Sequence, residues 1–455
     1  MANVSLLGSG GGTITVPVTS ANNAAVAQSA LAGINDAIAA GTLTEMVQTS
    51  ADLPAATAPS VLVLQPAAAL GPIELGNGYV AAVLDGPQQQ ALVGGVVANE
   101  TIISGTAGAL VSNFAANTEV IFGGGANAFI EQGGLGFDPS AAVWLDGSGY
   151  VDGSVGATTV FASTGAVVDL VDNGAGANVV DFEESDAEAA TNVIVLSGTA
   201  ETAATVNAVG AGLVAFQNGA AAVIDANESN VTIYGGAGAD WSGGGSVTLY
   251  GGMGSDLVSD GAGLFVAGIG GSSLLTSGTV AGAATLVGGG TGDTLIAQGS
   301  GDMMVAGPGN ETLTGAAAPI VAFGYTGAQP AATQMAGGLG GGNVFYVGNG
   351  VTELSASGGG NLLANISNQT SNAVITGFVS SEDAAGAPQA NPDAISLYWR
   401  ANGETYTLEQ GAAPLPGQVT FNYTTAAGVP SSEVQFGDGA TWTLVGTVLH
   451  PGDFV

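Results

Sequence analysis

Apolar residues occur along most of the chain in short runs that are separated by Gly, Pro, Asn, Asp and Ser. Runs of this kind, rich in Val, Ile and Leu and bounded by turn-forming residues, are typical of β-strands. The clearest early runs are residues 61–64, 79–84 and 91–97. Several prolines punctuate the same part of the chain, so we expect the strands of residues 51–118 to be joined irregularly.

One segment has the spacing of an amphipathic helix. Between residues 20 and 41, a set of apolar side chains lies on one helical face: Val26, Ala30, Leu31, Ile34 and Ile38. Ser20 is a good N-cap, and Gly41 stands where the residue after the last turn belongs. With a short strand at residues 13–18, this helix is expected to cover an end of the β-structure. A helix that docks a partner is the alternative.

From about residue 119 to 370 the sequence repeats a Gly-rich turn, an Asp or Asn, and a few apolar residues. Asn361 follows Asn343 at an interval of 18, whereas Asp293, Asp302 and Glu311 follow one another at intervals of 9. A period near 18 with two halves fits a flattened coil in which each half is a short strand and a tight turn. Successive coils then pair as parallel strands about 4.8 Å apart. A Gly-rich disordered linker is the alternative, and the recurring apolar triplets argue against it.

These patterns predict an all-β fold, a parallel β-solenoid of the β-roll or β-helix kind with a short N-terminal helix and a C-terminal β cap. We expect four parts along the chain. Residues 1–50 hold the N-terminal strand and helix, and residues 51–118 hold an irregular β segment. Residues 119–370 form the Gly-rich solenoid, and residues 371–455 form a C-terminal β domain.

The charge of the chain narrows the classes of function. It has 36 Asp and Glu, one Lys or Arg in total, and a formal net charge of −35. Such a chain repels nucleic acid and anionic lipid because the phosphate-neutralising cations are missing, and it attracts divalent cations. No Cys is present, so a disulfide framework is excluded. No apolar stretch reaches about 20 residues, so no membrane-spanning helix is expected.

Few residues offer catalytic chemistry. Neither Cys nor Lys is present, the single His450 lies close to the end of the chain, and Arg400 stands beside aromatic residues. We therefore assign no catalytic residue and expect that the protein is not an enzyme. Hydrolysis of a polysaccharide by two carboxyl groups is the catalytic alternative.

A motif with metal-binding character lies in the repeats. Residues 251–259 match the nonapeptide G-G-x-G-x-D-x-U-x, in which U is apolar. Residues 235–243 match its turn, whereas residues 288–296 and the run around Asp302 are degenerate copies. The Asp residues of these units are the candidate metal ligands: Asp240, Asp256, Asp293 and Asp302. For each of them the alternative is a turn-capping Asp that binds its own backbone.

These units resemble the calcium-binding β-roll repeats of the RTX (repeats-in-toxin) family, which Gram-negative bacteria export by type I secretion. The resemblance implies that the turn Asp residues and neighbouring carbonyl groups hold Ca²⁺, which prefers oxygen ligands. Asn replaces Asp, without its charge, in four further units: Asn127, Asn178, Asn343 and Asn361. The last residues, 449–455, are similar to the acidic-then-apolar tail of an uncleaved secretion signal. A cleaved N-terminal signal peptide is not expected.

Composition and resemblance together lead to three hypotheses, all placed outside a Gram-negative cell or on its surface. The first is a self-assembling structural protein, a surface-layer subunit or biofilm-matrix fibre, that binds itself with the help of calcium. Flat surfaces without Lys favour this hypothesis, because little side-chain entropy opposes close contact between copies. The second is a non-polymerising, calcium-dependent adhesin or a solenoid that binds cell-surface polysaccharide. The third is a secreted polysaccharide-active enzyme.

Overall fold

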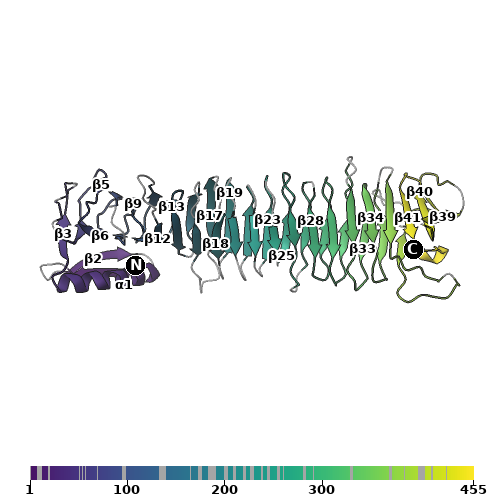
Figure 1. Ribbon diagram of the computed structural model, residues 1–455, viewed down its shortest axis with the longest axis horizontal. Coiled ribbons are helices and arrows are strands. Elements are labelled where there is room, and N and C mark those ends of the chain that lie inside the picture. The colour runs from purple at the N-terminus through teal and green to yellow at the C-terminus, as the bar shows by residue number, and fades with distance from the viewer. Residues whose placement is uncertain are drawn as a thin grey trace. The chain divides into compact units, whose positions relative to one another are not determined.

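The computed structural model describes two compact units, Met1–Val231 and Thr232–Val455, which we take one at a time (Figure 1). The description covers the chain except for these positions: 1, 8–12, 19–20, 51, 54, 57, 69, 95–98, 133–139, 164, 173–176, 183–190, 199–202, 209–211, 219–221, 226–229, 237–238, 243–245, 254–256, 260, 280–282, 291, 328–331, 368–370, 384, 398–404, 411–412 and 427. Strand β21 (Asn230–Tyr234) spans the boundary between the units.

In the first unit the chain alternates between two parallel sheets, which we name the even and the odd sheet after most of their strand numbers. The even sheet contains β3 (Thr44–Gln48), β4 (Ser60–Leu64), β6 (Tyr79–Leu84), β8 (Thr101–Ser104), β10 (Thr118–Phe122), β12 (Ser140–Leu145), β14 (Ala157–Ala162), β16 (Val179–Phe182), β18 (Ala204–Ala208) and β20 (Ala222–Asp225). The odd sheet contains β5 (Ile73–Glu74), β7 (Gln90–Val93), β9 (Ala109–Asn113), β11 (Asn127–Glu131), β13 (Gly149–Asp152), β15 (Val167–Asp172), β17 (Thr191–Gly198) and β19 (Gly212–Asn218).

The second unit repeats this arrangement, with one strand of each sheet per coil. Its even sheet contains β22 (Ala239–Ser242), β24 (Leu257–Ser259), β26 (Leu274–Thr276), β28 (Thr294–Ala297), β30 (Thr312–Gly315), β32 (Thr333–Ala336), β34 (Val351–Ser355) and β36 (Asn372–Thr376). Its odd sheet contains β23 (Ser246–Tyr250), β25 (Ala262–Val266), β27 (Thr285–Val287), β29 (Met303–Val305), β31 (Val321–Phe323), β33 (Val344–Val347), β35 (Leu362–Asn365) and β37 (Ala394–Ser396). The predicted parallel β-solenoid is thereby confirmed.

The strand register shows the expected repeat. In the odd sheet Met303 pairs with Thr285 on one side and Val321 on the other, and each partner lies one predicted period away along the chain. Other coils are shorter or longer, because their turns differ in length while the strands stay in register. Val167, for example, pairs with Val193, which lies well beyond one period. The predicted period is therefore that of the basic coil, and insertions are accommodated at the turns.

Alternation along each strand builds the core. In β27 Leu286 is buried between the half-buried Thr285 and Val287, and β29 repeats the pattern around Met304. Because successive side chains of a strand point to opposite faces, every second residue enters the space between the two sheets. Parallel pairing with the coils on both sides satisfies the backbone within the strands, so a core only a few side chains wide can be dry.

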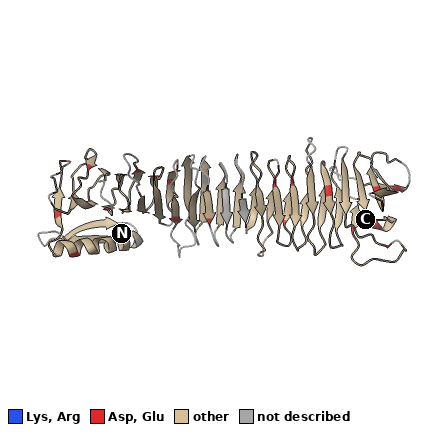
Figure 2. Ribbon diagram, in the orientation of Figure 1, with Lys and Arg blue, Asp and Glu red and all other residues tan. Residues whose placement is uncertain are grey.

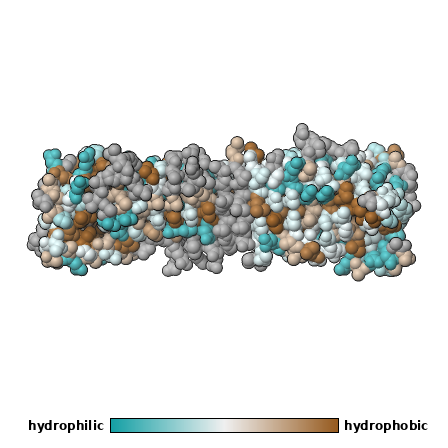
Figure 3. All heavy atoms as spheres, in the orientation of Figure 1, coloured by the Kyte–Doolittle hydropathy of each residue, from teal (hydrophilic) through white to brown (hydrophobic). Residues whose placement is uncertain are grey.

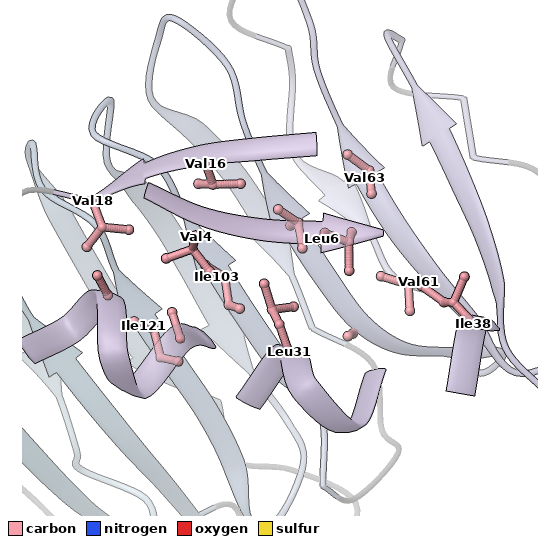
Figure 4. Close-up of a cluster of buried hydrophobic side chains, with 14 residues drawn as sticks. Val4, Leu6, Val16, Val18, Leu31, Ile38, Val61, Val63, Ile103 and Ile121 are labelled. Atoms are coloured by element: carbon pink, nitrogen blue, oxygen red, sulfur yellow. The ribbon is translucent and has the colours of Figure 1, made fainter. Parts of the chain in front are cut away.

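The N-terminal helix does not cover an end of the β-structure as expected. Helix α1 (Ala21–Ala39) and the antiparallel hairpin of β1 (Ala2–Leu7) and β2 (Thr13–Val18) lie on the outer face of the even sheet of the first unit (Figure 4). Leu31 and Ile38 of the helix join a buried cluster with outward-pointing side chains of the sheet: Val61, Val63, Val83, Ile103 and Ile121. The continuous apolar run at residues 61–64 reflects burial on both faces of one strand.

The C-terminal end of α1 agrees with the capping signal in the sequence. Gly41 has a φ of 74° and its N–H binds the carbonyl of Ile38, as expected for a glycine that ends a helix. The expected N-cap, Ser20, lies outside the described residues. Strand β2 covers residues 13–18 as predicted, whereas β1 was not foreseen.

The solenoid begins earlier than the expected boundary at residue 119. Strands β4, β6, β8 and β10 pair in parallel and in sequence order, so most of the segment 51–118 forms regular coils. Its described prolines stand between strands rather than within them: Pro59, Pro66, Pro72 and Pro87. Proline lacks the N–H that the strand ladder needs, but it is tolerated in turns. The irregularity is therefore confined to the connections.

The C-terminal cap agrees with expectation. After β36 the even sheet of the second unit continues through β41 (Thr441–Val445), β40 (Val429–Phe436), β39 (Gln418–Ala426) and β38 (Thr407–Gln410), with antiparallel pairs between β39, β40 and β41. The final residues pack against this unit, since Asp453 is fully buried and Phe454 bridges to Ile395. Among the described helices, none is both long and apolar enough to cross a membrane.

Glycine is required where consecutive turns touch. A Cβ at Gly289 would overlap the carbonyl oxygen of Ala267 in the preceding coil. A Cβ at Gly268 or Gly307 would likewise overlap a backbone carbonyl oxygen of the preceding coil. At this corner the coils stack backbone on backbone, and no side chain fits between them.

We therefore expect Gly289→Ala to lower the free energy of unfolding by about 1–3 kcal/mol, because the neighbouring coil must shift to admit the methyl group. Gly71→Ala is the matched control, since nothing lies within 4 Å of a Cβ there. Urea unfolding followed by circular dichroism measures both variants. Equal unfolding midpoints for the two would contradict close stacking at this corner.

Candidate functional site

The four candidate metal ligands are described to different extents. Asp293 and Asp302 are placed with their side chains, and both are completely buried in the second unit. Asp240 lies in β22, but its side chain is outside the description. Asp256 lies outside the described residues altogether. The geometry of the candidate site is therefore that of Asp293 and Asp302.

The carboxylate of Asp293 accepts three backbone hydrogen bonds. The N–H of Ser273, which holds the same position one coil earlier, donates to Oδ1 at 2.7 Å. The N–H groups of Gly289 and Gly290 in its own turn donate to Oδ2 at 2.8 and 3.0 Å. One side chain thus closes its own turn and ties it to the preceding coil.

Asp302 makes equivalent hydrogen bonds at the other corner of the coil. The N–H of Ala284, one coil earlier, donates to Oδ1 at 2.8 Å, and the N–H of Gly299 donates to Oδ2 at 2.8 Å. The hydroxyl of Ser277 also donates to Oδ2. Charge-assisted hydrogen bonds of this number stabilise a carboxylate without a metal ion.

Asparagines hold the equivalent position in neighbouring coils. The side-chain oxygen of Asn343 accepts the N–H of Ile320 at 3.2 Å, and that of Asn361 accepts the N–H of Asn343 at 2.9 Å. Asp393 in turn accepts the N–H of Asn361 at 2.7 Å. In the first unit, Asn127 and Asn178 bind the N–H groups of Ala109 and Thr158 in the same way.

We call these residues corner brackets: each stands at the start of a strand, and its side-chain oxygen accepts the N–H of the residue at the same position one coil earlier. Asp and Asn are interchangeable in this role, because it needs an oxygen acceptor and no charge. Both described Asp candidates have this geometry, which corresponds to the turn-capping alternative. Their oxygens are buried among N–H donors, and the described residues hold no group of three His, Cys, Asp or Glu side chains that could bind a metal. Ligation of Ca²⁺ by Asp293 and Asp302 stays a prediction from the motif.

Glu311 is a carboxyl group that the motif search did not single out as a site. It is 2% exposed and accepts the N–H of Gly307 on both oxygens, each at 2.9 Å. Burial raises its pKa to about 8, the N–H of Gly307 opposes this shift, and the charge of Asp293 one coil earlier adds to it. This raised pKa favours the protonated form of Glu311 at neutral pH. The sequence did contain a signal for this residue, because Glu311 follows Asp302 at the same interval of 9 at which Asp302 follows Asp293.

The outer surface of the second unit holds a feature that the sequence reasoning missed. On the odd sheet from β25 to β35, one column of outward side chains is almost entirely apolar: Leu264, Thr285, Met303, Val321, Val344 and Leu362. A second column begins at Val266 and passes through Phe323 and Tyr346, whose rings stack at 4.3 Å. We call these two columns over β25–β35 the odd face. None of its residues is charged.

Other described outer surfaces are more polar. The even sheet of the second unit presents Thr312, Thr314, Gln334 and Glu353, which line a shallow groove of about 450 Å³. The odd sheet of the first unit exposes part of Asp152 and Asp169. None of the described residues is Lys or Arg (Figure 2), because Arg400 lies outside the description. Figure 3 shows that hydrophobic residues lie among hydrophilic ones on the side of the second unit that it displays.

No family model, curated protein or solved structure matches this chain. The resemblance of its repeats to the RTX family accordingly stays a prediction from the motif.

Substitution of Asp302 separates the corner bracket from a metal ligand. Asp302→Asn keeps an oxygen acceptor, as at Asn343 and Asn361, and is expected to cost no more than about 1 kcal/mol. Asp302→Ala leaves buried N–H groups unpaired and is expected to cost about 2–4 kcal/mol. The free energy of unfolding of both variants is measured once in EGTA and once in Ca²⁺. A loss as large for Asn as for Ala, and present only in Ca²⁺, would identify Asp302 as a metal ligand.

Glu311 should make stability depend on pH. Its pKa in the folded protein is raised, so the folded state binds more protons than the unfolded state between about pH 4.5 and 8. Its contribution is fully present below pH 4.5 and is lost as the pH rises through 8. Glu311→Gln should reduce the decline of stability across this window by up to about 1.4 kcal/mol per pH unit.

The control is Glu353→Gln, which removes an exposed carboxyl group from the even sheet. Thermal and urea unfolding at pH 5 and pH 8.5 compare the two variants with the parent. If both variants follow the parent at both pH values, Glu311 is not protonated in the folded protein.

Proposed function

We propose that this chain is a secreted structural protein that assembles with copies of itself at or outside the surface of a Gram-negative cell. The assembly is a surface array or a matrix fibre. The observation that carries the proposal is the outward-facing, uncharged and largely apolar odd face on a regular solenoid. Extended apolar surface of this kind is a mark of association between proteins. The extracellular location rests on the resemblance of the repeats and the tail to exported proteins.

The charge of the chain supports association through this face. Most outer surfaces carry carboxylates, and the described residues include no Lys or Arg that compensates them. Contacts between copies through acidic surfaces bring like charges together, whereas contacts through the odd face do not. Divalent cations weaken the repulsion between the remaining carboxylates, so calcium is expected to assist assembly. Direct ligation of Ca²⁺ is proposed for the repeat Asp residues of the motif, Asp240, Asp256, Asp293 and Asp302.

A non-polymerising adhesin is the second candidate. Tyr234 and Tyr250 stack at a centroid distance of 5.5 Å, and each is 43% exposed. An exposed aromatic pair with hydroxyl groups offers an apolar surface with a polar rim to a ligand such as a polysaccharide. This observation supports ligand binding by a single copy. No observation on the described residues favours the polysaccharide-active enzyme.

Assembly of the purified chain tests the proposal. Light scattering over a range of protein concentrations, followed by electron microscopy, is expected to show ordered assemblies above a threshold concentration. Ca²⁺ should lower that threshold more than NaCl of equal ionic strength, because a divalent ion compensates two carboxylates. A protein that stays monomeric at every concentration, in Ca²⁺ and in EGTA, would exclude self-assembly and favour the adhesin.

A further inference from the structure

The odd face is regular in a way that restricts what can cover it. Its second column runs through consecutive coils in direct register: Val266, Val287, Val305, Phe323 and Tyr346. Parallel strands place these side chains about 4.8 Å apart, so the face is a set of ridges and grooves at one fixed spacing. A flat surface with that spacing is complementary to another surface that has the same spacing.

The absence of charge on the odd face further restricts the kinds of partner that can bind it. The odd face has no carboxylate, so it does not attract a basic protein, and the acidic surfaces elsewhere on the chain do. Side chains such as Val305 and Phe323 are half-buried by their neighbours within the sheet but still exposed on one side. A partner that covers them removes apolar area from water without desolvating a charge.

We propose that a second copy of this chain packs on the odd face with its own odd face, so that the two sheets lie face to face. This inference rests on the proposed self-assembly and names the surface that drives it. Two sheets packed in this manner lie about 10 Å apart, and side chains of one fill the grooves of the other. Both copies bring the same spacing together with the same uncharged apolar columns.

The contact through the odd face alone is small. Six strands at about 4.8 Å, with about 10 Å of each strand presented, give roughly 300 Å² of flat sheet per copy. Stable protein pairs bury about 1,200–2,000 Å² in total, so one such contact is weak. A face-to-face contact joins only two copies, so further contacts between such pairs must supply the additional free energy in an array or fibre.

Opposite charges introduced at one position test this geometry. Val305→Glu and Val305→Lys each place like charges across a face-to-face contact, and each is expected to raise the threshold concentration for assembly by about tenfold or more. An equal mixture of the two variants pairs Glu with Lys and is expected to restore assembly. Thr285→Glu and Thr285→Lys repeat the test on the neighbouring column, in case a variant at Val305 fails to fold.

The matched control is Thr314→Glu, which adds the same charge on the even sheet and should leave the threshold unchanged. Circular dichroism and thermal unfolding establish that each variant is folded. Assembly of Val305→Glu at the parent's threshold would overturn the odd face as the contact and leave the proposed function intact. Loss of assembly without rescue by the mixture would overturn the face-to-face arrangement.

Two further outcomes concern molecules other than a second copy that could cover the odd face. If the parent does not assemble but binds neutral phosphatidylcholine vesicles, and Val305→Glu abolishes that binding, the odd face meets lipid and the inference is wrong. If the parent neither assembles nor binds vesicles, self-assembly fails and the inference fails with it.

Discussion

The solenoid depends on hydrogen bonds to the backbone N–H groups at its corners. Within a strand each N–H binds the neighbouring coil, but at a corner the chain turns and a buried N–H loses that partner. A corner bracket supplies the missing acceptor: Asp302 binds Ala284, and Asn343 binds Ile320. Because the acceptor belongs to the next coil, each bracket also fixes the register of two coils. Close stacking of glycines such as Gly289 then becomes sterically possible on the adjoining turns.

The brackets also explain how a strongly acidic chain stacks its coils. Carboxyl groups at the same corner of consecutive coils repel each other in a medium of low polarity, and this repulsion adds to the effect of burial in raising the pKa of Glu311 beside Asp293. Asparagine at positions such as Asn343 and Asn361 accepts the same hydrogen bonds without that repulsion. The number of negative charges inside the solenoid is therefore limited in two ways. Asparagine replaces aspartate at some corners, and the raised pKa of Glu311 favours its uncharged form. On the outside of the second unit, the odd face carries no charged residue.

Much of the fold could be predicted from the sequence, because strand alternation and glycine spacing are local signals. The period of the coils, helix α1 and the C-terminal cap follow from them. The position of α1 could not be predicted, since the double burial of residues 61–64 looks the same whether a helix or another sheet covers the strand. The role of Asp302 was equally hidden. A turn Asp before an apolar strand fits a calcium ligand and a corner bracket alike, and only the placement of donors such as Gly299 separates them.

The odd face was hidden for a related reason. Runs such as residues 344–347 are apolar at every position, and the sequence does not show that alternate side chains are left uncovered.

The central claim is that acceptor groups of the protein itself bind the backbone N–H groups at the corners, and amide hydrogen exchange in EGTA tests it most directly. The account predicts slow exchange at Ala284, Gly289 and Gly299, and no further slowing when Ca²⁺ is added. Fast exchange that becomes slow only with Ca²⁺ would contradict it.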